Sequence, residues 1–264
     1  MSAGPRASAW PRRLEQGPAR IIAPGELASW VVHEDDRLLV VDKPGDVVCH
    51  PSKHGPWSSL VGACRERLGL ATIHLVFRLD RETSGIVVLA KDPGMASRLQ
   101  RAMQERKVGK RYLAVLTGAL AGPVRVDQPL GDDTASPVFI KSAVCADGQP
   151  SVTLFEPLAA AGGFTFAAVT TETGRKHQIR AHAQWLGHPL VGDKIYGPDA
   201  RLYLDFIRDG WNPKLEAALL LPRQALHCSL VDLRPAGLEA VFAAPLPADM
   251  AGFCRSRGLP MPAT

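Results

Sequence analysis

The stretch F-R-L-D-R-E-T-S-G-I-V-V-L-A-K, residues 77–91, joins a charged loop to an apolar run. Residues 86–90 are β-branched or otherwise apolar, which is typical of a strand in a sheet interior. Asp80 precedes this strand by a Thr-Ser-Gly turn, so we expect it to be held rigidly at a strand edge. The neighbouring guanidinium of Arg78 favours the ionised carboxylate, which suits a nucleophile or a base. The alternative is structural: Asp80 forms a salt bridge with Arg78 or caps the turn through Thr83.

Strands and helices on both sides of this stretch predict the fold class. Strands are expected at residues 37–42, 112–117, 152–157, 164–171 and 225–233, with a Gly-Gly hairpin turn at residues 162–163. Helices are expected from Pro93 with Asp92 as N-cap, at residues 174–186, and within residues 197–223. Strands interspersed with helices, without regular βαβ alternation, indicate an α+β domain on a mixed, mostly antiparallel sheet flanked by helices.

Composition and boundaries predict one domain after a short arm. Residues 1–25 contain four prolines and no periodicity, which predicts a flexible arm, and residues 26–264 form the domain. With 264 residues, of which 46% are hydrophobic, the chain can bury an ordinary core. A net charge of +5 and a pI near 9.1 favour polyanionic partners.

Cysteine usage and targeting signals bear on the compartment. The five cysteines are odd in number and scattered, without a C-x-x-C pair, so neither a disulfide framework nor a zinc ribbon is predicted. The sequence has no signal-peptide core and no apolar run near the roughly 18 residues of a membrane span. We therefore expect a soluble, cytoplasmic protein with reduced thiols. No heptad repeat demands assembly, so we expect a monomer.

A dense basic stretch lies on and just beyond the helix expected from Pro93. Its cations are Arg98, Arg101, Arg106, Lys107, Lys110 and Arg111, opposed only by Glu105. This stretch either holds the phosphates of a polyanion or is an ordinary solvated face.

Residues 173–180, T-G-R-K-H-Q-I-R, hold a second group of candidate residues. His177, Arg180 and Gln184 fall at i, i+3 and i+7, so one helix face presents them together and can hold an anion. Alternatively, His177 is a core histidine hydrogen-bonded to backbone. No Cys or acidic partner stands at ligand spacing, so we expect no metal site.

A third motif and three missing motifs limit the classes of enzyme to which the chain can belong. Residues 187–196, G-H-P-L-V-G-D-K-I-Y, form a Gly- and Pro-rich turn that would fix the position of Tyr196. The sequence contains no Gly-rich phosphate loop, no G-x-S-x-G and no H-E-x-x-H. The sequence therefore lacks the motifs of nucleotide hydrolases, serine esterases and zinc proteases.

Six segments, taken in order, give the chain a family resemblance. They are K-P-G (43–45), R-L-D-R-E-T-S-G (78–85), K-R-Y-L-A-V-L-T-G (110–118), T-G-R-K-H-Q-I-R (173–180), G-H-P-L-V-G-D-K-I-Y (187–196) and A-L-H-C (225–228). In order and spacing they resemble the RluA-type RNA pseudouridine synthases over about residues 30–253. The resemblance implies the pseudouridine synthase fold and isomerisation of uridine in ribosomal or transfer RNA. The arm is too short to hold a separate S4-type RNA-binding module.

The resemblance also implies roles for particular residues. Asp80 is expected to be the catalytic carboxylate, Tyr112 to stack on the target uracil and help remove the C5 proton, and Arg180 to pair with Asp80. No cofactor or metal is implied. The residues expected to bind RNA are Phe77, Arg78, Arg98, Arg101, Lys107, Lys110, Arg111, Arg175, Lys176 and His177. Phe77 stands where the family usually has His, so a planar side chain is kept and its polar edge is not.

Two other functions are compatible with these residues. A uridine inside an RNA helix must be extruded to reach Asp80, and Phe77 and Arg78 are candidates to fill the gap. The first alternative is a catalytically silent RNA-binding protein of the same fold, motivated by Phe77. The second is an N-glycosidase that releases free uracil, because a carboxylate can equally support glycosidic cleavage.

Overall fold

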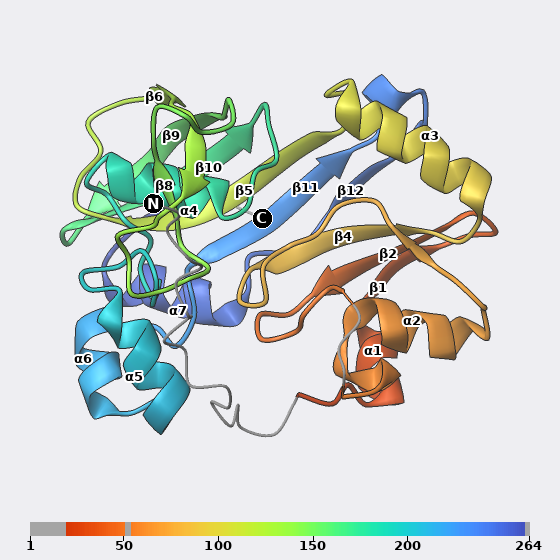
Figure 1. Cartoon of the computed structure of the whole chain (residues 1–264), viewed down its shortest axis with the longest axis horizontal. Helices are drawn as coiled ribbons and strands as arrows, with labels where there is room; N and C mark the ends of the chain where they lie inside the picture. The colour runs from red at the N-terminus through yellow and green to blue at the C-terminus, as the bar shows by residue number, and fades with distance from the viewer. Residues whose placement is uncertain (1–19, 51–53, 262–264) are drawn as a thin grey trace, which may run out of the picture.

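Twelve strands form two sheets in the described residues of the computed structural model, which are 20–50 and 54–261. The large sheet contains β1 (Val31–Glu34), β2 (Leu38–Lys43), β3 (His74–Leu75), β4 (Ser84–Ala90), β5 (Gly109–Thr117), β6 (Val124–Asp127), β9 (Val152–Ala161), β10 (Phe164–Thr171), β11 (Leu226–Asp232) and β12 (Val241–Ala243). Its order is β1-β2-β4-β11-β5-β10-β9-β6, with β3 beside β4 and β12 beside β11 (Figure 1). The small sheet pairs β7 (Leu130–Asp132) with β8 (Ser142–Val144).

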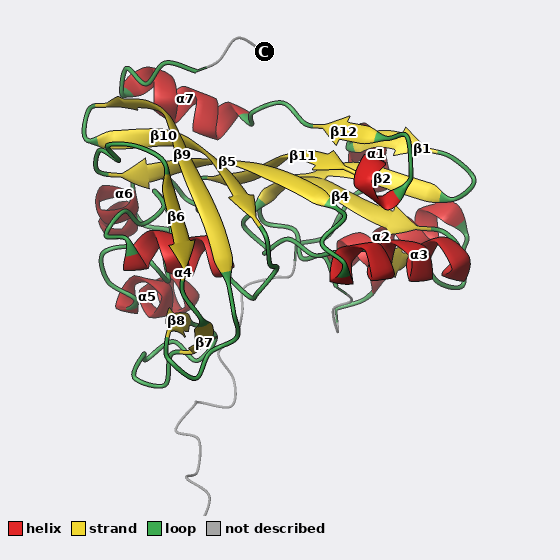
Figure 2. Ribbon diagram, turned by 90° about the horizontal axis from the view of Figure 1, so that it is seen from above, coloured by secondary structure: helices red, strands yellow, loops and turns green. Residues whose placement is uncertain are grey.

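Helices lie on both faces of the large sheet. They are α1 (Pro24–Ser29), α2 (Leu60–Leu68), α3 (Pro93–Gln104), α4 (Gln178–Trp185), α5 (Arg201–Asp209), α6 (Pro213–Leu219) and α7 (Ala248–Ser256). Figure 2 shows α2 and α3 beneath the half of the sheet that contains β1, β2 and β4, and α4, α5 and α6 beneath the other half. Helix α7 lies on the opposite face. The helices beneath the sheet therefore form two groups, one under each half.

Strand β5 shows how alternation assigns side chains to the two faces. Val115 packs in one buried cluster with Phe166 and with Phe253 of α7. Its neighbours Ala114 and Leu116, like Tyr112, belong to the main core on the opposite face. Because successive side chains of a strand point to opposite faces, Tyr112 points away from α7, toward the face that carries the other helices.

The pairing of β4 with β11 depends on a glycine. All seven residues of β4 are buried, and Ser84 and Gly85 pair in parallel with His227 and Cys228. Gly85 has φ +114°, and a Cβ there would lie 2.2 Å from the carbonyl oxygen of Cys228. Only glycine allows this approach, so the Thr-Ser-Gly turn of the sequence sets the contact between two central strands.

Most of the predicted elements are confirmed. The five expected strands correspond to β2, β5, β9, β10 and β11, with the hairpin at residues 162–163. Asp92 caps α3, because its Oδ1 accepts a hydrogen bond of 2.8 Å from the Met95 amide. Among the described strands only β4 and β11 pair in parallel, so the mixed, mostly antiparallel sheet of an α+β fold is also confirmed.

The helix predicted over residues 174–186 begins four residues later, at Gln178. His177 takes a left-handed conformation with φ +56°, which a helix does not allow. The side-chain oxygen of Gln178 accepts hydrogen bonds from the Thr173 hydroxyl (2.7 Å) and the Arg175 amide (3.1 Å). Residues 173–177 therefore form a tight turn that Gln178 closes from within the helix.

The expected arm ends earlier than predicted. Residues 1–19 lie outside the described residues, but Ile22 is only 1% exposed and donates its amide to the Trp57 carbonyl at 2.8 Å. Helix α1 then begins at Pro24. The folded part therefore includes residues 20–25. No helix in the described part of the chain combines the length and apolar character that crossing a membrane requires.

Candidate active site

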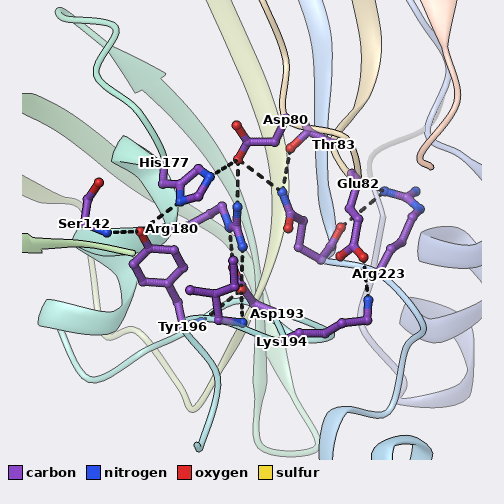
Figure 3. A network of polar contacts seen from close by, with 12 residues as sticks. Asp80, Glu82, Thr83, Ser142, His177, Arg180, Asp193, Lys194, Tyr196 and Arg223 are labelled. Carbon is purple, nitrogen blue, oxygen red and sulfur yellow. Dashed lines mark hydrogen bonds and ion pairs between the residues drawn. The ribbon is translucent and has the colours of Figure 1, made fainter. Parts of the chain in front are cut away.

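Asp80 lies in the loop between β3 and β4, where its carboxylate meets a guanidinium from the other half of the sheet (Figure 3). Its Oδ2 accepts a hydrogen bond of 2.9 Å from Nη1 of Arg180, on α4. Gln224 Nε2 lies 3.5 Å from the same oxygen and donates to the Thr83 hydroxyl at 2.8 Å. Asp80 therefore pairs with Arg180, 100 residues away in sequence, as the sequence predicted. Arg78 forms no ion pair with Asp80: its side chain is exposed, and its charge only helps to lower the pKa of that carboxyl.

Arg180 is itself fixed by a second carboxylate that the sequence analysis missed. Its Nε and Nη2 donate to Oδ2 and Oδ1 of Asp193 at 2.7 and 2.9 Å. Asp193 is fully buried, and its Oδ1 also accepts the amides of Ile195 and Tyr196, both at 3.0 Å. The planar fork of an arginine matches this bidentate geometry. Asp193 thus positions the guanidinium that faces Asp80.

The ion pair keeps Asp80 charged. Burial, the largest single effect, would raise the pKa of this carboxyl, but the attractions of its neighbours, of which Arg180 contributes most, together outweigh it and hold the pKa below its ordinary value of 3.8. The Asp80 side chain retains 24% exposure, whereas that of Arg180 retains 5%. The site therefore presents an ionised carboxylate that is accessible from one side and supported by a buried cation from the other.

His177 faces the same carboxylate from the turn before α4. Its Nε2 lies 3.8 Å from Asp80 Oδ2, and its Nδ1 lies 3.0 Å from the Tyr196 hydroxyl. Burial lowers the pKa of His177 to about 4, so the ring is neutral at pH 7. Tyr196 Oη already accepts the Ser142 amide at 2.7 Å, so we infer that its proton goes to Nδ1. His177 then turns an Nε2–H toward Asp80.

Buried cations fix the backbone of the Asp80 loop. Lys43 has no exposed surface, and its Nζ donates to the carbonyl oxygens of Pro44 (2.7 Å) and Arg81 (3.1 Å). Burial lowers the pKa of Lys43 to about 8. Arg223 donates to the Glu82 carbonyl at 3.1 Å, so the two residues after Asp80 are each held by a cation. Hydrogen bonds from these cations to its carbonyl oxygens therefore hold the loop in place.

Two hollows meet at Asp80. The larger is a cleft of about 1230 Å³ between the Asp80 loop and α5. The smaller, of about 450 Å³, lies beside the centre of β5 and includes Tyr112, His177 and Arg180 in its walls. Asp80 borders both, so its carboxylate can meet a group that enters either hollow.

The smaller hollow gathers many of the residues predicted from sequence. Phe77, Arg78, Lys110, Tyr112 and Arg175 line it together with the groups around Asp80. Tyr112 is 7% exposed, and burial raises the pKa of its phenol well above 10. The Lys110 ammonium lies 5.3 Å from the Phe77 ring centroid, so Phe77 acts as an apolar wall beneath a cation.

Other predicted RNA contacts lie apart from Asp80. Arg98 donates to the carbonyl of Gly237 at 2.6 Å, beyond the end of β11, whereas Gln224, at the Asp80 site, precedes its start. Seven strand residues span roughly 20 Å, so Arg98 is distant from the Asp80 carboxylate. Arg101, Lys107 and Arg111 are exposed on or after α3, and Lys176 pairs with Asp132 at 2.8 Å.

In the described part of the chain, no group of three or more His, Cys, Asp or Glu side chains is arranged to hold a metal ion. Asp80, Asp193 and Glu82 instead pair with Arg180 or Lys194. The carboxylates at the site therefore have cationic side chains as their partners.

Sequence comparisons find relatives over most of the chain. The family profile described as RNA pseudouridylate synthase matches residues 37–185. A protein of Vibrio vulnificus named ribosomal large subunit pseudouridine synthase D is 36% identical over 227 residues, which are 83% of this chain and 68% of that protein. An uncharacterized RNA pseudouridine synthase of Bacillus subtilis is 37% identical, over 83% of this chain and 73% of that protein.

Structural comparison finds the same fold in solved proteins. The human protein RNA pseudouridylate synthase domain containing 4 superimposes with a TM-score of 0.71 at 24% identity, over 91% of this chain and 97% of that one. The human domain containing 1 gives a TM-score of 0.64 at 25% identity, over 81% and 82% of the two chains. The strand order and the two groups of helices are thus those of a known architecture.

Proposed function

Since the chain belongs to the RNA pseudouridylate synthase family, and so converts uridine in RNA to pseudouridine, we propose that Asp80 is the carboxylate on which this reaction depends. The observation that carries the proposal is the chain of charges from Asp80 through Arg180 to the buried Asp193. It supplies an ionised oxygen with one open side at the junction of two hollows.

The reaction needs such a carboxylate at its first step. Isomerisation breaks the N1–C1′ bond, turns the uracil while it stays bound, joins C5 to C1′ and releases the C5 proton. An ionised Asp80 can either attack C1′ or take a proton from C2′. Arg180 keeps the carboxylate charged, and preorganised charge of this kind is a large contributor to catalysis.

The detached uracil also needs a surface that retains it. We assign this role to the smaller hollow, where Tyr112 offers an aromatic face and Phe77 an apolar wall. The raised pKa of Tyr112 keeps its phenol protonated at neutral pH, which supports stacking and hydrogen-bond donation. Lys110 and Arg175 at the same hollow are suited to the phosphates of an extruded nucleotide.

We propose RNA of the large ribosomal subunit as the substrate, following the name of the Vibrio vulnificus relative. An enzyme with this substrate would act in the cytoplasm, where ribosomal RNA is available. The proposed steps use a carboxylate, a guanidinium and an aromatic surface, so they need neither a metal nor an organic cofactor. A single chain contains all of these groups, so we propose that the monomer catalyses the reaction.

Asp80→Asn tests the proposal. The amide keeps the shape of the side chain and loses its charge, so tritium release from [5-³H]uridine in transcribed large-subunit ribosomal RNA should fall at least about 10³-fold. Folding and RNA affinity should stay close to those of the wild type. Asp127→Asn is the matched control, because Asp127 is exposed and pairs only with the exposed Arg125 and no site residue. Tritium release by Asp80→Asn at the wild-type rate would contradict the role of Asp80.

A further inference from the structure

The larger cleft exceeds what the target base alone requires. Its volume is about 1230 Å³, whereas pockets for whole drug-sized ligands measure about 300–1,000 Å³. The smaller hollow already offers a place for the uracil. The cleft continues from Asp80 to α5, so a strand of RNA whose uridine sits at Asp80 has its neighbouring nucleotides directed along it.

The cleft contains cations that no carboxylate engages. Arg78 and Arg81 bracket Asp80, are exposed, and form no hydrogen bond or ion pair through their side chains with the described residues. The other cationic side chains that border the cleft and have carboxylate partners are Arg20, Arg180, Lys194, Arg208 and Arg223. Arg78 and Arg81 are therefore the guanidiniums available for phosphates at this position.

Two isoleucines that border the cleft lie outside the hydrophobic core. Ile207 of α5 is partly exposed, and Ile140 is 41% exposed; both border the cleft, and neither joins a hydrophobic cluster of the described residues. Tyr203 of α5 borders the same cleft; burial raises its pKa, and Arg81 and Glu82 lie near enough to influence it. Its hydroxyl therefore points toward the loop that carries Asp80.

The Tyr203 hydroxyl forms no hydrogen bond with the described residues and is not a buried atom, so it is open to the cleft. An aromatic ring with an open hydroxyl, in a cleft shared with two isoleucines and two guanidiniums, matches the faces and edges of a nucleotide. Single-stranded nucleic acids are bound in this way, by aromatic side chains within a cationic groove.

We propose that the larger cleft binds the RNA strand next to the target uridine. Arg81, with Arg78, holds the phosphates, and a neighbouring base lies on Tyr203 and Ile207. This inference rests on the proposed function, because Asp80 defines where the target uridine sits. It makes α5 a determinant of which uridines are modified, through the nucleotides beside them.

Salt dependence of RNA binding tests the phosphate contact. For a fluorescein-labelled oligouridylate of 12 nucleotides, Arg81→Gln should reduce the slope of log K against log salt by about 0.7, the value for one single-strand phosphate contact. Arg201→Gln is the control on the same helix wall, because Arg201 lies outside the cleft and pairs with Asp199. Equal slopes for Arg81→Gln and the wild type would overturn the phosphate role.

Turnover on long RNA tests the contact of a base with Tyr203 and Ile207. Tyr203→Leu keeps apolar bulk but removes the ring, and Ile207→Asp puts a negative charge in the cleft. Each should lower kcat/KM on transcribed large-subunit ribosomal RNA at least about 5-fold, mainly by raising KM. Ile207→Leu should restore wild-type kinetics. Thermal unfolding identifies any variant that fails to fold; if Tyr203→Leu fails, Ile207→Asp decides the question, with Ile207→Leu as its control.

The two proposals fail in different ways. If the wild type forms pseudouridine, and Tyr203→Leu and Ile207→Asp match its kcat/KM, the cleft proposal is wrong and the role of Asp80 is untouched. If Asp80→Asn retains full activity, the role of Asp80 is wrong, while the oligouridylate slopes still report on Arg81 because binding requires no turnover.

Discussion

At the scale of single residues, the sequence predicted the pair of Asp80 with Arg180 and missed the carboxylate that supports this pair. The pairing of Asp80 with Arg180 was predicted through the resemblance and is observed at 2.9 Å. Read by itself, the R-x-D stretch favoured a salt bridge with Arg78, whereas the structure pairs Asp80 with Arg180. Asp193 was missed because its importance comes from burial against Arg180, 13 residues earlier, and no local pattern reports burial. The catalytic and RNA-binding roles of individual residues stay predictions.

A buried histidine predicts how stability depends on pH. His227 is 1% exposed, with Nδ1 3.0 Å from the Ser84 hydroxyl, and burial lowers its pKa from 6.5 to about 4. Between these values the unfolded chain binds a proton that the folded protein does not, so stability falls as the pH falls through this window. The shift corresponds to a contribution of roughly 3 kcal/mol that is complete above pH 6.5 and lost near pH 4.

His227→Gln removes this titration. Urea unfolding at pH 7 and pH 4.5 should show that the variant is less stable than the wild type at pH 7, but loses about 2 kcal/mol less on acidification. The comparison is between the two pH dependences, since other groups also titrate. Equal losses of stability in both proteins would mean that His227 is charged in the folded state.

At the scale of elements, local sequence signals were sufficient to predict a boundary or a turn where one residue type decides it. Asp92 and Pro93 began α3 as predicted, and Gly162 and Gly163 turned the hairpin. The start of α4 was misplaced because His177 takes a left-handed conformation and Gln178 is held by Val152 and Thr153 of β9, which are contacts that no local pattern reports. A strained backbone position at a reactive centre is where local rules are expected to fail.

Two glycines should respond oppositely to the same substitution. Gly85→Ala must place a Cβ 2.2 Å from the Cys228 carbonyl at φ +114°, so we expect a loss of at least about 2 kcal/mol and reduced activity. Gly252 lies inside α7 with nothing within 4 Å of a built Cβ, so Gly252→Ala should stabilise by about 0.5–1 kcal/mol. Denaturant unfolding measures both, and a Gly85→Ala protein as stable as the wild type would refute the steric account of the β4–β11 pair.

At the scale of the whole molecule, composition and pattern predicted the class and not the arrangement. The mostly antiparallel α+β domain was predicted, whereas the strand order was not, because the central β4–β11 pair joins segments without a shared local signal. The excursion at residues 197–223 proved to be α5 and α6, and α5 borders the cleft. Neither the silent RNA-binding protein nor the glycosidase gains support from relatives named as pseudouridine synthases.

Arg223 connects α7 to the Asp80 loop across the sheet. It pairs with Asp249 at 2.6 Å and donates to the Glu82 carbonyl, with only 12% of its side chain exposed. Arg223→Ala leaves these acceptors without their partner, so stability should fall by about 2–4 kcal/mol and kcat should fall with it. Arg234→Ala is the control. The Arg234 side chain, which pairs with Asp232, is 60% exposed, so this ion pair contributes at most about 1 kcal/mol to stability. Similar losses for both variants, measured by denaturant unfolding, would contradict the structural role of Arg223.

The pairing of β4 with β11 has a consequence for when the protein first becomes active. Ser84 and His227 touch across 143 residues of sequence, and Asp80 meets Arg180 across 100. Contacts that close such long loops form late in folding and slow it. The centre of the sheet stays incomplete until β11 has been synthesised, so a nascent chain shorter than this cannot shape the loop of Asp80. We therefore expect a nascent chain to stay inactive until β11 has emerged from the ribosome.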